Sequence, residues 1–231
     1  MINTKQNHFA FTLAEVLITL GIIGVVAAMT IPTLITNYKA KRLHSQFLKS
    51  YSTVQQAFKM MENDDVSLDP SIYISQKWGD GKAFYETFIN YLSGATDCRK
   101  KSNPQCYHGG KGYTSYDGKS SAPAYLFDDG MIALQDGTLL LFENATKNVG
   151  SIYVSVDLNG YEGKPNRWGY DLFTFQFLDG ELKTMGDKGT FYANMNQYCN
   201  PKVSNVHNGI ACAQKAKEDT DYFKKLIKEF K

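Results

Sequence analysis

The sequence predicts an α+β fold in which one long N-terminal helix packs against an antiparallel β-sheet. An apolar run over 11–35 continues into a segment whose apolar residues recur at helical spacing. Short strand-like segments separated by Asp-Gly pairs then fill much of the second half of the chain. A long helix followed by an antiparallel meander belongs to the α+β class.

The apolar run opens the predicted helix and contains one charge. At about 1.5 Å per residue, the segment from Phe11 to Ile35 is long enough to cross a bilayer core of roughly 30 Å. Glu15 is its one ionisable side chain, and no Lys or Arg lies between Lys5 and Lys39. An unpaired carboxylate in lipid is unfavourable. A cut before Phe11 would create an α-amino group near Glu15, so we expect the amine of one subunit to pair with Glu15 of the next.

The apolar residues that follow the run are spaced to form one buried helical face. Their steps are three or four residues, and no Gly or Pro interrupts 33–62. We therefore predict one helix from about Thr12 to Met61, about 75 Å long, with a bend where Pro32 lacks a backbone donor. The apolar face consists of Leu43, Phe47, Tyr51, Val54, Phe58 and Met61.

The remaining elements are shorter. A second helix is predicted within 79–91, and 97–122 has the composition of a loop. The first two predicted strands form a hairpin across Asp128-Asp129-Gly130, and the apolar spacing of 211–231 predicts an amphipathic helix that packs on its own domain or contacts a membrane. The predicted strands are 124–127, 131–134, 138–143, 151–156, 172–178 and 181–185.

The N-terminal motif resembles that of the type IV pilin and type II secretion pseudopilin family. Phe11, Thr12, Leu13 and Glu15 follow a short polar leader, and Ala10 stands where most members have glycine. The resemblance implies that a prepilin peptidase cuts between Ala10 and Phe11, that the new Phe11 amine is methylated, and that Glu15 directs assembly. It divides the chain into a leader (1–10), a transmembrane and assembly segment (11–36) and a pilin-like head (37–231).

The same resemblance implies a structural function. The chain would be a subunit of a type IV pilus or of a type II secretion pseudopilus, with homologous subunits and the prepilin peptidase as partners. It would cross the inner membrane once, with its head outside the cytoplasm, before it enters the fibre. Counting charges favours the opposite orientation, since Lys5 precedes the span while Lys39, Lys41 and Arg42 follow it. We follow the motif because it is more specific.

Four cysteines form two pairs of near neighbours in the sequence. They are Cys98, Cys106, Cys199 and Cys212, and neither pair has the C-x-x-C spacing of a zinc or redox motif. Because the family resemblance implies an exported head, we expect disulfides Cys98–Cys106 and Cys199–Cys212. The alternative, four reduced thiols, requires a cytosolic location.

The segment 157–171 combines acidic and amide side chains with glycines. Asp157, Asn159 and Asp171 could supply oxygen ligands for calcium, as related loops do in major pseudopilins, but they are also typical of turns. The segment lacks the Glu that an EF-hand loop has at its twelfth position. We prefer a structural turn and predict neither a metal nor a cofactor.

No enzymatic motif is evident, and no enzyme is predicted. The four histidines are dispersed, and the chain has no G-x-S-x-G, P-loop or Rossmann motif. A net charge of +2 gives no strong attraction to nucleic acid. The alternatives are an anchored adhesin or minor pilin whose head binds a surface, sugar or DNA, an anchored enzyme, a simple anchor, and a secreted protein cut after Ala28.

Overall fold

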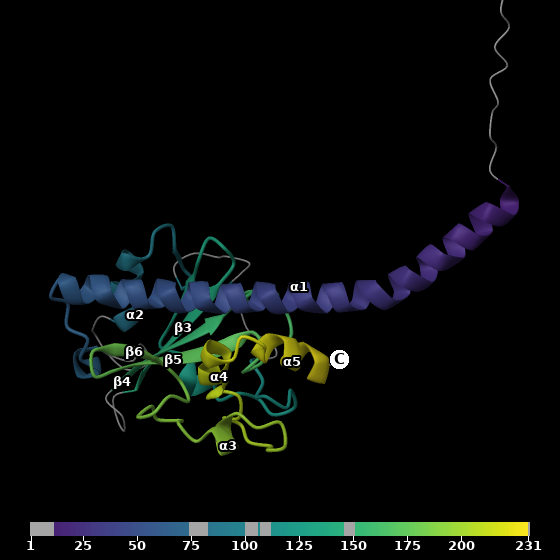
Figure 1. Cartoon of the computed structure of the whole chain (residues 1–231). Helices are drawn as coiled ribbons and strands as arrows, with labels where there is room; N and C mark the ends of the chain where they lie inside the picture. The colour runs from purple at the N-terminus through teal and green to yellow at the C-terminus, as the bar shows by residue number, and fades with distance from the viewer. Residues whose placement is uncertain (1–11, 74–82, 100–105, 107–111, 146–150, 231) are drawn as a thin grey trace, which may run out of the picture.

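The first element is a single helix that exceeds the rest of the molecule in length (Figure 1). The computed structural model describes residues 12–73, 83–99, 106, 112–145 and 151–230. Helix α1 spans Leu13–Asn63, 51 residues, which confirms the predicted long helix. Its C-terminal half lies along the head, while its N-terminal half extends beyond it and curves away (Figure 1). Pro32 lies inside the helix, where it removes one backbone hydrogen bond and favours this curvature.

The head contains one antiparallel sheet. In the described part of the chain the sheet has six strands, in sequence order and each antiparallel to the next. This is the meander that the Asp-Gly turns predicted. The strands are β1 (Thr96–Asp97), β2 (Gly130–Ala133), β3 (Leu139–Ala145), β4 (Ser151–Asp157), β5 (Leu172–Leu178) and β6 (Glu181–Thr184).

The first predicted hairpin is wrong. Ala124–Leu126 is a 3-10 helix, η3, and β2 pairs at its outer edge with β1, a strand that was not predicted. Pro123 fixes the backbone before η3, and its carbonyl accepts a hydrogen bond from the Leu126 N–H, so this segment turns instead of extending. Asp128 and Asp129 therefore lead into β2 from one side and do not close a hairpin.

Aromatic side chains join α1 to one face of the sheet. The Phe47 ring lies 4.9 Å from that of Phe173, and the Phe58 ring stacks on that of Phe177 at 4.4 Å between centroids. Helix α2 (Phe84–Phe88) covers the far end of this face, where Phe88 contacts the Phe58 ring at 5.2 Å. The predicted apolar face of α1 is thus the surface on which the head is mounted.

The C-terminal segment forms two helices, α4 (Cys212–Glu218) and α5 (Tyr222–Glu229). Phe223 of α5 contacts Phe47 of α1 and Phe173 of β5, with ring centroids 6.2 and 5.6 Å apart. The Tyr222 hydroxyl donates to the Gly169 carbonyl at 2.6 Å. The apolar face of α5 therefore packs on its own domain.

Loops cover the other face of the sheet, and two disulfides cross-link segments of the head. Trp168 and Tyr113 are buried there against β3 and β5. Cys98 is bonded to Cys106, and Cys199 at the end of α3 (Met195–Tyr198) is bonded to Cys212 at the start of α4. These are the two pairings expected from the sequence.

Candidate functional site

The N-terminus of α1 is closed by a capping box. Thr12 is the N-cap, and its side-chain oxygen accepts the Glu15 N–H at 3.3 Å. The Glu15 carboxylate accepts in return from the Thr12 N–H and the Thr12 hydroxyl, both at 2.8 Å. These bonds satisfy donors that the first turn of a helix leaves unpaired, and they hold the carboxylate at the helix end.

The apolar half of α1 is uncovered. Leu13, Leu17 and Met29 are 78%, 62% and 73% exposed, and the large apolar side chains up to Ile35 share this state. Among the described residues, α1 is the one helix long and apolar enough to cross a membrane, by length and composition. Moving each such side chain out of water contributes about 1.5–3 kcal/mol. This surface therefore needs lipid or other protein helices around it.

Part of the predicted site lies outside the described residues. Ala10 and Phe11, the expected cleavage and methylation positions, precede Thr12, where the description starts. Glu15 lies within the described residues, where it forms the capping box with Thr12. Its pairing with the amine of a neighbouring subunit stays a prediction. The four cysteines lie in the head, away from the exposed half of α1.

The segment 157–171 is tied together by its two buried carboxylates. Asp171 accepts from the backbone N–H groups of Asn166 and Arg167 at 2.9 and 2.7 Å. Asp157 accepts from the Asn159 N–H at 3.2 Å and from the Tyr113 hydroxyl at 2.9 Å. All four carboxylate oxygens thus accept a hydrogen bond, which is how a structural turn uses these residues. The amide oxygens of Asn159 and Asn166 are buried without a hydrogen-bond partner.

Burial also changes the acidity of this segment. Removal from water, and the proximity of Asp171, raise the pKa of Asp157 to about 7. Burial raises the pKa of Asp171 to about 6, although the Arg167 and Asn166 N–H groups oppose this shift. The loop therefore holds carboxyl groups whose charge changes between acidic and neutral pH.

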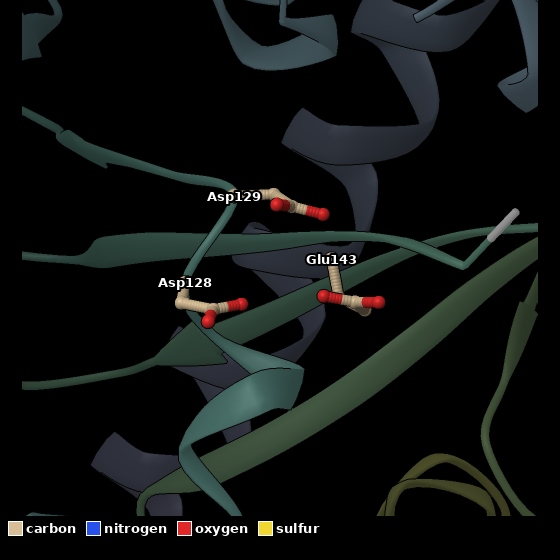
Figure 2. Close-up of side chains that lie close together, drawn as sticks. All are labelled: Asp128, Asp129 and Glu143. Carbon is tan, nitrogen blue, oxygen red and sulfur yellow. The ribbon is translucent and has the colours of Figure 1, made fainter. Parts of the chain in front are cut away.

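A second acidic group lies where β2 meets β3. Figure 2 shows Asp128 and Asp129, from the segment before β2, directing their carboxylates toward that of Glu143 on β3. One oxygen of each lies within 4.8 Å of the others. Burial, followed by the charges of Asp129 and Asp128, raises the pKa of Glu143 to about 8. Sequence reasoning missed this group because it assigned Asp128 and Asp129 to a hairpin turn, and only the register of β2 on β3 brings them beside Glu143.

The fold and the uncovered helix together define a class of protein. It is an α+β protein with an apolar N-terminal helix suited to membrane anchoring, and with a head mounted on the second half of that helix. Residues 5–31 match the family model described as the prokaryotic N-terminal methylation motif, which supports a type IV pilin-like family. No curated protein and no solved structure matches the chain.

The match agrees with the sequence resemblance on the kind of function. The motif supports a pilin- or pseudopilin-type subunit, which is a structural kind of protein. It also supports processing by a prepilin peptidase and association with other pilin-type subunits.

Proposed function

We propose that the protein is a structural subunit of a type IV pilus or of a type II secretion pseudopilus. Prepilin peptidase removes the leader (1–10) by cutting between Ala10 and Phe11, and the Phe11 amine is methylated. The segment 11–36 then serves first as the transmembrane anchor and afterwards as the core of the fibre. The head (37–231) forms the outer surface.

One observation carries this proposal: the apolar half of α1 is exposed and has a single carboxylate at its start. Apolar side chains that leave lipid for a bundle of identical helices stay out of water, so assembly depends on packing and on the polar contacts that set its register. Glu15 is held at the helix end by Thr12. The Phe11 amine of a neighbouring subunit neutralises it and fixes the axial offset between subunits.

We further propose that the head lies outside the cytoplasm. Before assembly the subunit lies in the inner membrane, with its leader on the cytoplasmic side. The two disulfides support this orientation, because such bonds persist in oxidising compartments. This arrangement opposes the simple charge count across the span, in which the more basic side would face the cytoplasm.

Substitution of Glu15 by valine tests the proposal. The variant keeps the apolar helix, so we expect normal membrane insertion and cleavage but a fibre yield at least about tenfold lower, since a lost ion pair of about 1.4 kcal/mol has that effect. Glu62→Gln, which removes the other acidic side chain of α1, is the matched control and should assemble normally. Normal fibre yield from Glu15→Val would refute the assembly role.

A second candidate function is adhesion by a minor subunit. Tyr125 and Phe191 are large aromatic side chains that remain exposed on the head, and Tyr125 contacts His207 through a hydrogen bond of 2.6 Å. Exposed aromatic rings are common where proteins bind partners. Abundance separates the two functions, because a major subunit dominates the fibre while an adhesin is scarce and lies at the tip.

A further inference from the structure

We propose that Asp128, Asp129 and Glu143 form a binding site for a divalent cation and that Ca²⁺ is the ion that fits it. The site lies on the head, where the segment before β2 meets β3 (Figure 2). It is independent of the proposed fibre function, since it depends only on how the head folds.

The geometry brings three carboxylates within reach of one ion. One oxygen of each lies within 4.8 Å of the others. Two oxygens bound to the same Ca²⁺ at about 2.3–2.6 Å are at most about 5 Å apart, so one ion can bridge all three. The backbone keeps them together, because Gly130 pairs with Phe142 in the register of β2 on β3 and the Asn144 N–H donates to Asp129 at 2.8 Å.

The burial of the group favours a cation over three separate charges. Asp129 is only 5% exposed, Glu143 is half-buried, and Asp128 is at the surface. Like charges gathered in a partly buried place repel one another more strongly than in water. A divalent ion relieves this repulsion, and the exposed Asp128 side leaves an entry path from solvent.

Tyr153 supplies an independent indication of a ligand. It lies directly opposite Glu143 in the register of β3 on β4, so both side chains lie on the same face of the sheet. Tyr153 is 3% exposed, and its hydroxyl is buried without a hydrogen-bond partner. An unsatisfied buried hydroxyl is unfavourable, and a cation or its bound water beside Glu143 would satisfy it.

The chemistry of these groups selects the ion. Carboxylate and hydroxyl oxygens are hard ligands, whereas zinc prefers the nitrogen and sulfur ligands that this group lacks. Magnesium requires a near-ideal octahedron and keeps several waters, while calcium accepts irregular sets of six to eight oxygens. Three carboxylates on a partly open surface fit the affinity of extracellular calcium modules, about 10⁻⁴–10⁻³ M.

Calcium titration of the full chain in detergent tests the proposal. Terbium luminescence sensitised by tyrosine reports the site, and displacement of terbium by CaCl₂ gives the calcium affinity. We expect saturable binding with a Kd of about 10⁻⁴–10⁻³ M, weakened at least about tenfold in Glu143→Gln and in Asp129→Asn. Tyr153→Phe, which keeps the ring, should weaken binding about threefold. Glu181→Gln removes an exposed carboxylate on β6 and should bind like the wild type.

The variant Glu143→Gln also guards against a false result from misfolding. Without calcium its melting temperature near neutral pH should be close to that of the wild type, because the raised pKa of about 8 keeps the Glu143 carboxyl largely protonated and the amide has the same size and charge. Calcium should raise the melting temperature of the wild type and of Glu181→Gln, raise that of Tyr153→Phe less, and leave that of Glu143→Gln unchanged at the same concentration. The proposal is overturned if the wild type binds no calcium below about 10 mM, if Glu143→Gln binds equally well, or if only Asp171→Asn abolishes binding, which would place the ion in 157–171.

Discussion

Replacing Phe47 by alanine removes the side chain by which α1 contacts both the sheet and α5. Phe47 is 0% exposed, and its ring lies 4.9, 5.8 and 6.2 Å from the rings of Phe173, Phe175 and Phe223. Truncation of a buried phenylalanine to alanine costs about 3–5 kcal/mol, depending on how far the site collapses. Since the rings around it belong to two other elements, the site collapses little, and we expect a loss of about 4 kcal/mol in the free energy of unfolding.

Urea unfolding of the full chain in detergent measures this loss, with tryptophan fluorescence, to which buried Trp168 contributes, as the probe of the head. Leu17→Ala is the matched control, because Leu17 lies on the same helix but is 62% exposed. It should change the stability of the head by no more than about 0.5 kcal/mol while lowering fibre yield. A loss below about 1 kcal/mol for Phe47→Ala, or an equal loss for Leu17→Ala, would refute the division of α1 into a mounting half and an uncovered half.

Two further predictions concern the stability of the head. Replacing Cys199 and Cys212 by serine opens a loop with a sequence separation of 13, and should lower the free energy of unfolding by about 3 kcal/mol, measured by urea unfolding without reductant. Because burial raises the pKa of Asp157 from its usual 3.8 to about 7, the folded state binds this proton more tightly than the unfolded state. Stability should therefore fall as the pH rises from about 4 to 7, and Asp157→Asn should flatten this dependence in melting curves taken across that range. A pH profile that is unchanged in Asp157→Asn would contradict the assignment.

The long helix could be predicted because two strong patterns follow one another without a break. The apolar run over 11–35 has no competing turn residues, and the face built on Phe47 and Phe58 has helical spacing. Five strands could be predicted from alternation and Asp-Gly turns, and the disulfides from sequence proximity together with the family resemblance.

The parts that were missed depend on contacts between distant segments. Strand β1 has two residues, too few to show the alternation of apolar and polar residues that predicts a strand. It forms because Thr96 and Asp97 pair with Ala133 and Ile132 of β2. The acidic group at Glu143 depends likewise on strand register. The segment Ala124–Leu126 has strand-like composition, but Pro123 and its accepting carbonyl turn it into a 3-10 helix.

The mass of the N-terminal peptide, taken from protein recovered from its native cells, tests the central claim most directly. Processing as a prepilin predicts a peptide that begins at N-methylated Phe11, since the cut after Ala10 creates the amine that Glu15 is proposed to bind. A peptide that still contains residues 1–10, or one that begins at Met29 after signal-peptide cleavage, would contradict the account.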